Sequence, residues 1–172
     1  MSFYTANHTV PDLNYEYSIV TVDTIGQESN NTFTVHLMTP LNNVVQAKLL
    51  ATHINTKQSN RHIYVSIEEL EVAPILNQRG SNVSTGQNGA LSNVSGVFGS
   101  MVTHAIPKGN QDYHHVFQNE YPIVSQYLEP LQNLSTLTIK IYGIDGNTIK
   151  PDHDDEINSI ILSFITRRRI VP

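Results

Sequence analysis

The sequence LSTLTIKIYG, residues 134–143, alternates apolar and polar side chains with a period of two. In an extended chain successive side chains point to opposite faces, so this spacing separates the two kinds of side chain. One face carries Leu137, Ile139 and Ile141. The other face carries threonine, lysine and tyrosine side chains. The pattern predicts a β-strand with one face in a hydrophobic core and the other toward solvent.

Similar runs recur along the chain and predict about eight strands joined by polar loops. The other runs are 18–22, 32–37, 44–55, 62–70, 94–106, 113–119 and 159–166. Residues 123–134 have room for one helical turn, which Pro130 limits. Because strands do not alternate with helices, a parallel sheet is disfavoured. We therefore expect an all-β fold, an antiparallel two-sheet sandwich with a single jelly roll of about eight strands and long loops.

The strand pattern also suggests the domain organisation. Residues 1–17 are polar and include Pro11, which predicts an extended N-terminal arm. Residues 18–172 are then one jelly-roll domain, since a chain of 172 residues supports one substantial core. The long loop 74–93 is rich in Gly, Asn and Ser. We expect the arm and this loop to become ordered only on assembly with other subunits.

Composition excludes several classes of protein. A formal net charge of −5 makes nucleic-acid binding unlikely, because such proteins need a basic surface. The chain has no Cys, so disulfides and thiolate chemistry are impossible. The first residues do not resemble a signal peptide, and no run is long and apolar enough for a membrane span. We expect a soluble protein that is assembled inside the cell.

The acidic stretch DGNTIKPDHDDE, residues 145–156, is the strongest candidate for a metal site. It fails as an EF-hand loop, because Lys150 occupies the position that requires glycine and the flanking segments are predicted strands. Asp145 and Gly146 instead form a typical hairpin turn. A divalent-ion site made of three of its carboxylates with His153 is less favoured. The prediction is a solvated loop with no metal and no cofactor.

Catalytic motifs are also lacking. The sequence contains no G-x-S-x-G elbow and no phosphate-binding loop with lysine. A metal-dependent cupin enzyme remains a minor alternative, which would place two histidines on the inner face of one strand. His114 and His115 are neighbours, so they should point to opposite faces and cannot share an ion. We therefore predict no catalytic residues, and we expect the histidines to be ordinary core or surface residues.

Arg167, Arg168 and Arg169 form the only basic cluster in this acidic chain. Such a run is most often a solvated tail. Guanidinium groups also pair bidentately with carboxylates and phosphates. These three arginines are therefore our candidates for contact with a partner.

Three segments carry a resemblance to a known family: HIYVSIEEL (62–70), VFGSMVTHAIPKG (97–109) and EYPIVSQYLEPLQNLSTLTIKIYGIDGNTI (120–149), followed by the closing strand SIILSFIT (159–166). Together they resemble single jelly-roll minor capsid or penton-type proteins of large icosahedral double-stranded DNA viruses. The resemblance covers about 100 residues and consists of hydrophobic spacing and turns. It implies a structural virion protein without catalysis.

The expected function follows from this resemblance. The chain would oligomerise or cement major capsomers in the virion, with the major capsid protein and other capsid subunits as partners. Its uncharged polar surface suits wet interfaces between subunits. The alternative is a carbohydrate-binding jelly roll for viral attachment. That module would use loop side chains such as Tyr113, Tyr121 and Asp145.

Overall fold

A computed structural model of the chain describes residues 14–27, 31–57, 62–71, 97–109, 112–143, 149 and 157–168. Within these residues the chain forms nine strands and one short 3-10 helix. The elements in chain order are β1 (Tyr15–Asp23), β2 (Thr32–Leu41), β3 (Val44–Thr56), β4 (His62–Ile67), η1 (Glu68–Leu70), β5 (Gly99–Val102), β6 (His104–Gly109), β7 (Asp112–Leu131), β8 (Leu134–Gly143) and β9 (Ser159–Arg167).

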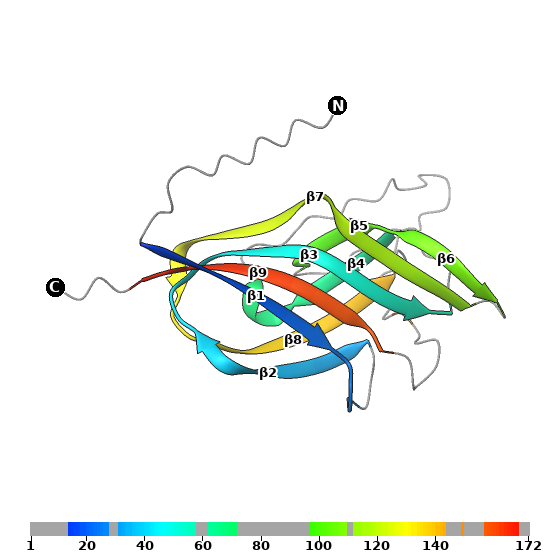
Figure 1. Ribbon diagram of the computed structural model, residues 1–172, viewed down its shortest axis with the longest axis horizontal. Coiled ribbons are helices and arrows are strands. Elements are labelled where there is room, and N and C mark those ends of the chain that lie inside the picture. Colours follow the sequence, from blue (N-terminus) through cyan, green and yellow to red (C-terminus); the bar gives the residue numbers. More distant parts are fainter. Residues whose placement is uncertain are drawn as a thin grey trace, which may run out of the picture.

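The strands form two antiparallel sheets packed face to face (Figure 1). One sheet has the order β1-β9-β3-β7-β6, and the other has the order β2-β8-β4-β5. The strands pair as in one long hairpin that is folded over itself, with the pairs β1–β9, β2–β8, β3–β7 and β4–β5. Successive pairs lie in alternate sheets. This connectivity is that of a jelly roll. The predicted fold class is confirmed, with β6 as a ninth strand at one sheet edge.

The core lies between the sheets and follows the predicted alternation. In β8 the apolar face of Leu137, Ile139 and Ile141 is fully buried, whereas Thr138 and Lys140 are only half-buried. In β9 the inward residues Leu162 and Phe164 are also fully buried. The period-two pattern thus identified the core strands correctly, because one face of each strand must leave water.

The segment 123–134 forms a strand where a helical turn was expected. The suggested helical turn at 123–134 is wrong: most of this segment belongs to the 20-residue strand β7. Pro122 and Pro130 fall where the β3–β7 register shifts, between paired stretches of the ladder. A proline at such an irregularity does not remove a ladder hydrogen bond, so the strand continues.

The run 94–106 was predicted as one strand, and its described part is divided between the two sheets. β5 ends at Val102 and pairs with β4, whereas β6 starts at His104 and pairs with β7. Between them Thr103 is buried, and its hydroxyl lies 3.0 Å from Nδ1 of His115. The second ring nitrogen of His115 lies 3.0 Å from the Thr56 hydroxyl. His115 is therefore a satisfied core histidine that supports the point where the chain changes sheet.

The first strand begins at Tyr15, so residues 15–17 of the predicted arm belong to β1. Residues 1–13 and the predicted loop 74–93 lie outside the described residues. The same holds for the predicted hairpin at Asp145 and Gly146. Among the described residues, none forms a helix with the length and apolar character that a membrane crossing needs.

A buried polar cluster holds one end of the sandwich together. The side chain of Asn158, fully buried before β9, accepts the Asn55 backbone N–H at 2.8 Å and donates to Asn31 Oδ1 at 3.1 Å. Its backbone N–H donates to the Thr24 hydroxyl at 3.0 Å. The Asn158 side chain thus joins the end of β3 to the residue before β2, and its backbone N–H adds the segment that follows β1.

The partly buried position of His62, at the start of β4, leads us to expect that the stability of the fold depends on pH. Its Nε2 lies 2.5 Å from the Ser100 hydroxyl, and burial lowers the pKa of its imidazole from 6.5. The imidazole of the unfolded chain therefore binds a proton more readily than that of the folded protein. As a result, the contribution of neutral His62 to the free energy of unfolding is complete above pH 6.5 and is lost as the pH falls toward the folded-state pKa. The free energy of unfolding, measured by urea denaturation, should fall less between pH 7 and pH 5 in His62→Gln than in the native protein. His36→Gln, a substitution in β2, is the control; equal pH profiles for the native and His62→Gln proteins would contradict the prediction.

Candidate interaction surface

The outer face of the β1-β9-β3-β7-β6 sheet carries several exposed apolar side chains. Strand register places side chains in rows across it. One row is Tyr17, Ile165, Gln46 and Gln126, and the next is Ile19, Ser163, Lys48 and Val124. Each row thus pairs an apolar residue of edge strand β1 with side chains from three further strands.

Exposure shows how much of this face is open to solvent. Tyr17 and Ile19 are 72% and 70% exposed, and Leu128 of β7 is fully exposed. Single exposed apolar residues are normal on protein surfaces. Here four of them share one sheet face, two on β1 and two on β7, and exposed apolar residues gathered on one face are frequent at interaction sites. We call Tyr17, Ile19, Val124 and Leu128 the apolar outer face.

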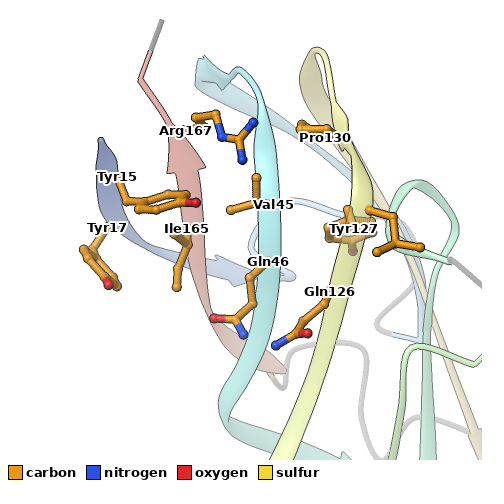
Figure 2. Close-up of a pocket in the computed structure, with 10 residues that line it drawn as sticks. Tyr15, Tyr17, Val45, Gln46, Gln126, Tyr127, Pro130, Ile165 and Arg167 are labelled. Atoms are coloured by element: carbon orange, nitrogen blue, oxygen red, sulfur yellow. The ribbon is translucent and has the colours of Figure 1, made fainter. Parts of the chain in front are cut away.

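A groove of about 420 Å³ runs along one end of this face (Figure 2). Figure 2 shows Tyr15 and Tyr17 on β1, with Gln46 and Gln126 side by side on β3 and β7. The rest of the lining comes from Val45, Tyr127, Leu128, Pro130, Ile165 and Arg167. Tyrosine rings, amides and one guanidinium give the groove both apolar area and hydrogen-bonding groups, a combination frequent in binding interfaces.

The predicted arginine cluster lies at the same end of the sheet. Arg167 is exposed, pairs with Tyr15 across the β1–β9 ladder and lines the groove. The Nε of Arg168 donates to Glu16 at 2.6 Å, and both side chains are 54% exposed. A half-exposed ion pair of this kind contributes little to stability. Arg169 lies outside the described residues. The structure therefore associates Arg167, rather than the whole cluster, with the groove.

The opposite end of the outer face carries histidines. His114 points outward, with its Nε2 3.3 Å from Nε2 of His53 and its Nδ1 2.8 Å from Asn55 Oδ1. His115 points into the core, as described above. The prediction that these neighbours face opposite sides is confirmed. The pairing of His114 with His53 was missed, because the two residues are 61 positions apart and only the β3–β7 register brings them together.

Of the side chains named for glycan binding, the two described ones, Tyr113 and Tyr121, lie at different places along β7. The Tyr121 hydroxyl donates to the Ser100 carbonyl at 2.9 Å and accepts the Val102 N–H at 2.6 Å. The Tyr121 hydroxyl therefore stabilises the contact between β5 and β7. Tyr113 lies at the start of β7, half-buried beside His115 at a ring distance of 6.4 Å. Asp145 lies outside the described residues.

Side chains that could bind a metal ion are not grouped together among the described residues. In that part of the chain no three His, Cys, Asp or Glu side chains come together in a group able to hold an ion. Most of the acidic stretch 145–156 is outside the described residues; only Ile149 is described, and it is buried in the core.

The sequence matches no protein-family model, and comparison with curated proteins gives no match. The functional argument therefore depends on the fold and on the surface described above.

Proposed function

We propose that the protein is a structural capsid subunit, a minor capsid or penton-type component that oligomerises or cements major capsomers without catalysis. The observation that carries the proposal is the apolar outer face on a jelly-roll sheet. A jelly roll packs its core between two sheets and needs nothing on the outside of either. Exposed Tyr17, Ile19 and Leu128 are therefore more readily explained by contact with another subunit than by folding.

The energetics show why a subunit contact needs several apolar residues. Burying one large apolar side chain contributes about 1.5–3 kcal/mol, and association costs about 4–15 kcal/mol in lost freedom. Several such residues on one face are needed before a contact is stable. The apolar outer face supplies four large side chains, and the groove beside it adds the tyrosine, glutamine and arginine groups that interfaces favour. The virion is accordingly the proposed location.

Self-association can be measured by analytical ultracentrifugation over a range of protein concentrations. We expect the native chain to form a defined oligomer or to bind the major capsid protein of its virus. We expect the double substitution Tyr17→Ser and Leu128→Ser to raise the Kd about tenfold or more, because it removes two exposed apolar contacts.

Met38→Ser is the matched control, since Met38 is also fully exposed but lies on β2 of the other sheet. It should leave the Kd unchanged. A native chain that stays monomeric and has no affinity for capsid proteins would refute the proposal. Equal effects of the double substitution and the control would show that the outer face is not the contact surface.

The second candidate function is carbohydrate binding during viral attachment. The groove favours it to a lesser degree, because tyrosine rings stack on sugar faces and the Gln46 and Gln126 amides can hydrogen-bond hydroxyls. A glycan array separates the two functions. Specific glycan signals that disappear with Tyr17→Ser would support attachment, whereas an empty array with an intact oligomer would support the structural role.

A further inference from the structure

Strand β1 lies at an edge of its sheet, and its one paired neighbour among the described residues is β9. At one end of this ladder the Asn14 carbonyl accepts the Arg168 N–H at 2.8 Å. At the other end the Thr24 N–H donates to the Asn158 carbonyl at 3.1 Å. Hydrogen-bonded pairs alternate along an antiparallel ladder, so the even-numbered residues between these ends also bond to β9. The backbone groups of the odd-numbered residues therefore point out of the sheet edge: Tyr15, Tyr17, Ile19, Thr21 and Asp23.

The sequence of β1 lacks the features that protect sheet edges. An unprotected edge pairs readily with other strands, so proteins keep edge strands short or place proline, lysine or a bulge on them. The nine residues of β1 pair with β9 without a register shift. Their sequence, YEYSIVTVD, contains no proline, glycine or lysine, and its middle part is uncharged. β1 thus has the length and regularity of an interior strand at an edge position.

The other edge strands of the described sheets do carry such features. β5 has only four residues. β6 contains Pro107 and Lys108, and its register with β7 shifts beyond Pro107. β2 contains Pro40, and its pairing with β8 is interrupted after His36. This contrast indicates that the edge of β1 is kept open for a partner strand.

We propose that the partner strand is β1 of a second copy, paired antiparallel about a two-fold axis at Ile19. The inference rests on the proposed oligomerisation of the chain and specifies the contact that forms it. Ile19 is the middle residue of β1, so this register pairs the whole strand. It places Ile19 opposite the partner's Ile19 and Tyr17 opposite the partner's Thr21. These residues then meet through the backbone groups that point out of the edge, and the sheets of two copies become continuous.

The charges of β1 suit this antiparallel pairing. Glu16 falls opposite the partner's Val22, and Asp23 falls opposite the partner's Tyr15. No acidic residue of the strand therefore faces another one. A parallel pairing in the same register would place each acid beside its own copy, and like charges at opposed positions are destabilising.

The exposed side chains of the apolar outer face agree with a contact at the edge. Tyr17 and Ile19 are both largely exposed, and strand pairing brings them against side chains of the second copy. Val124 and Leu128 belong to β7, which is separated from β1 by β9 and β3. Pairing through β1 therefore leaves this part of the outer face open for a capsomer.

Complementary charges at Ile19 test the two-fold axis by sedimentation velocity of the full chain. Ile19→Lys and Ile19→Glu each place like charges opposite one another at the axis, so each variant alone should stay monomeric where the native chain associates. An equimolar mixture of the two should recover the dimer, because opposite charges then face each other. Met38→Lys and Met38→Glu are the matched controls on β2 of the other sheet, and each alone should associate like the native chain.

A proline at Thr21 tests the backbone pairing. Thr21→Pro removes an N–H that points out of the edge and leaves the hydrogen bonds between β1 and β9 intact. We expect it to raise the Kd of self-association about tenfold or more. Met38→Pro is the control, because Met38 is exposed and lies where the pairing of β2 with β8 is interrupted. It should leave the Kd unchanged, and thermal unfolding of each variant checks that the fold is retained.

The outcomes separate this inference from the capsid proposal. If the Ile19 variants and Thr21→Pro associate as tightly as the native chain, the edge pairing is overturned and the capsid proposal stands. Loss of association without recovery in the mixture overturns the two-fold pairing, because another segment then occupies the edge. A monomeric native chain that binds capsid proteins overturns this inference alone. A monomeric native chain without such affinity overturns both.

Discussion

Asn158→Ala is expected to lower the free energy of unfolding by about 2–4 kcal/mol. The Asn158 side chain is fully buried, and it accepts from the Asn55 N–H and donates to Asn31 Oδ1. Truncation leaves both partners without this interaction, and each buried polar group that loses its partner costs about 1–3 kcal/mol. Because the free energy of unfolding of a globular domain is about 5–15 kcal/mol, this loss is a large share of the stability of the fold.

Urea denaturation followed by circular dichroism measures this change. The exposed Asn42, in the connection between β2 and β3, supplies the control substitution Asn42→Ala, which should change stability by less than about 0.5 kcal/mol. If Asn158→Ala costs no more than this control, the buried polar cluster does not hold that end of the sandwich together.

Phe117→Ala is expected to cost about 3–5 kcal/mol and to lower the Tm by about 10 °C. Phe117 is fully buried on the inner face of β7 and packs edge-on against Tyr121, with ring centroids 5.3 Å apart. The substitution removes apolar burial, opens a cavity between the sheets and abolishes the aromatic pair.

Scanning calorimetry is the measurement, with two controls that bracket the effect. Phe117→Leu keeps most of the apolar volume, so it should cost well under half as much. Leu128→Ala, on the exposed side of the same strand, should change the Tm little because its side chain is already in water. Similar losses for Phe117→Ala and Leu128→Ala would contradict the assignment of the two faces of β7.

The functional surface was only partly predictable from the sequence. Arg167 was singled out as part of a basic run, and it does line the groove. Tyr17, Ile19 and Leu128 were not singled out, since a local pattern does not show which apolar side chains stay exposed or which strands they share a face with. The contact between His53 and His114 was hidden for a similar reason: a contact between side chains of two strands has no characteristic sequence spacing.

The sequence by itself determined where most strands lie and which face of the clearly alternating ones, such as β8 and β9, enters the core, because alternation with period two is a local property of an extended backbone. It also determined the fold class, through the number of strands and the lack of helical segments between them. Only the tertiary structure decided the length of β7, the change of sheet at Thr103 and the rows of side chains across the outer face. These depend on register between strands far apart in the chain, where bulges at prolines and buried hydrogen bonds select one pairing.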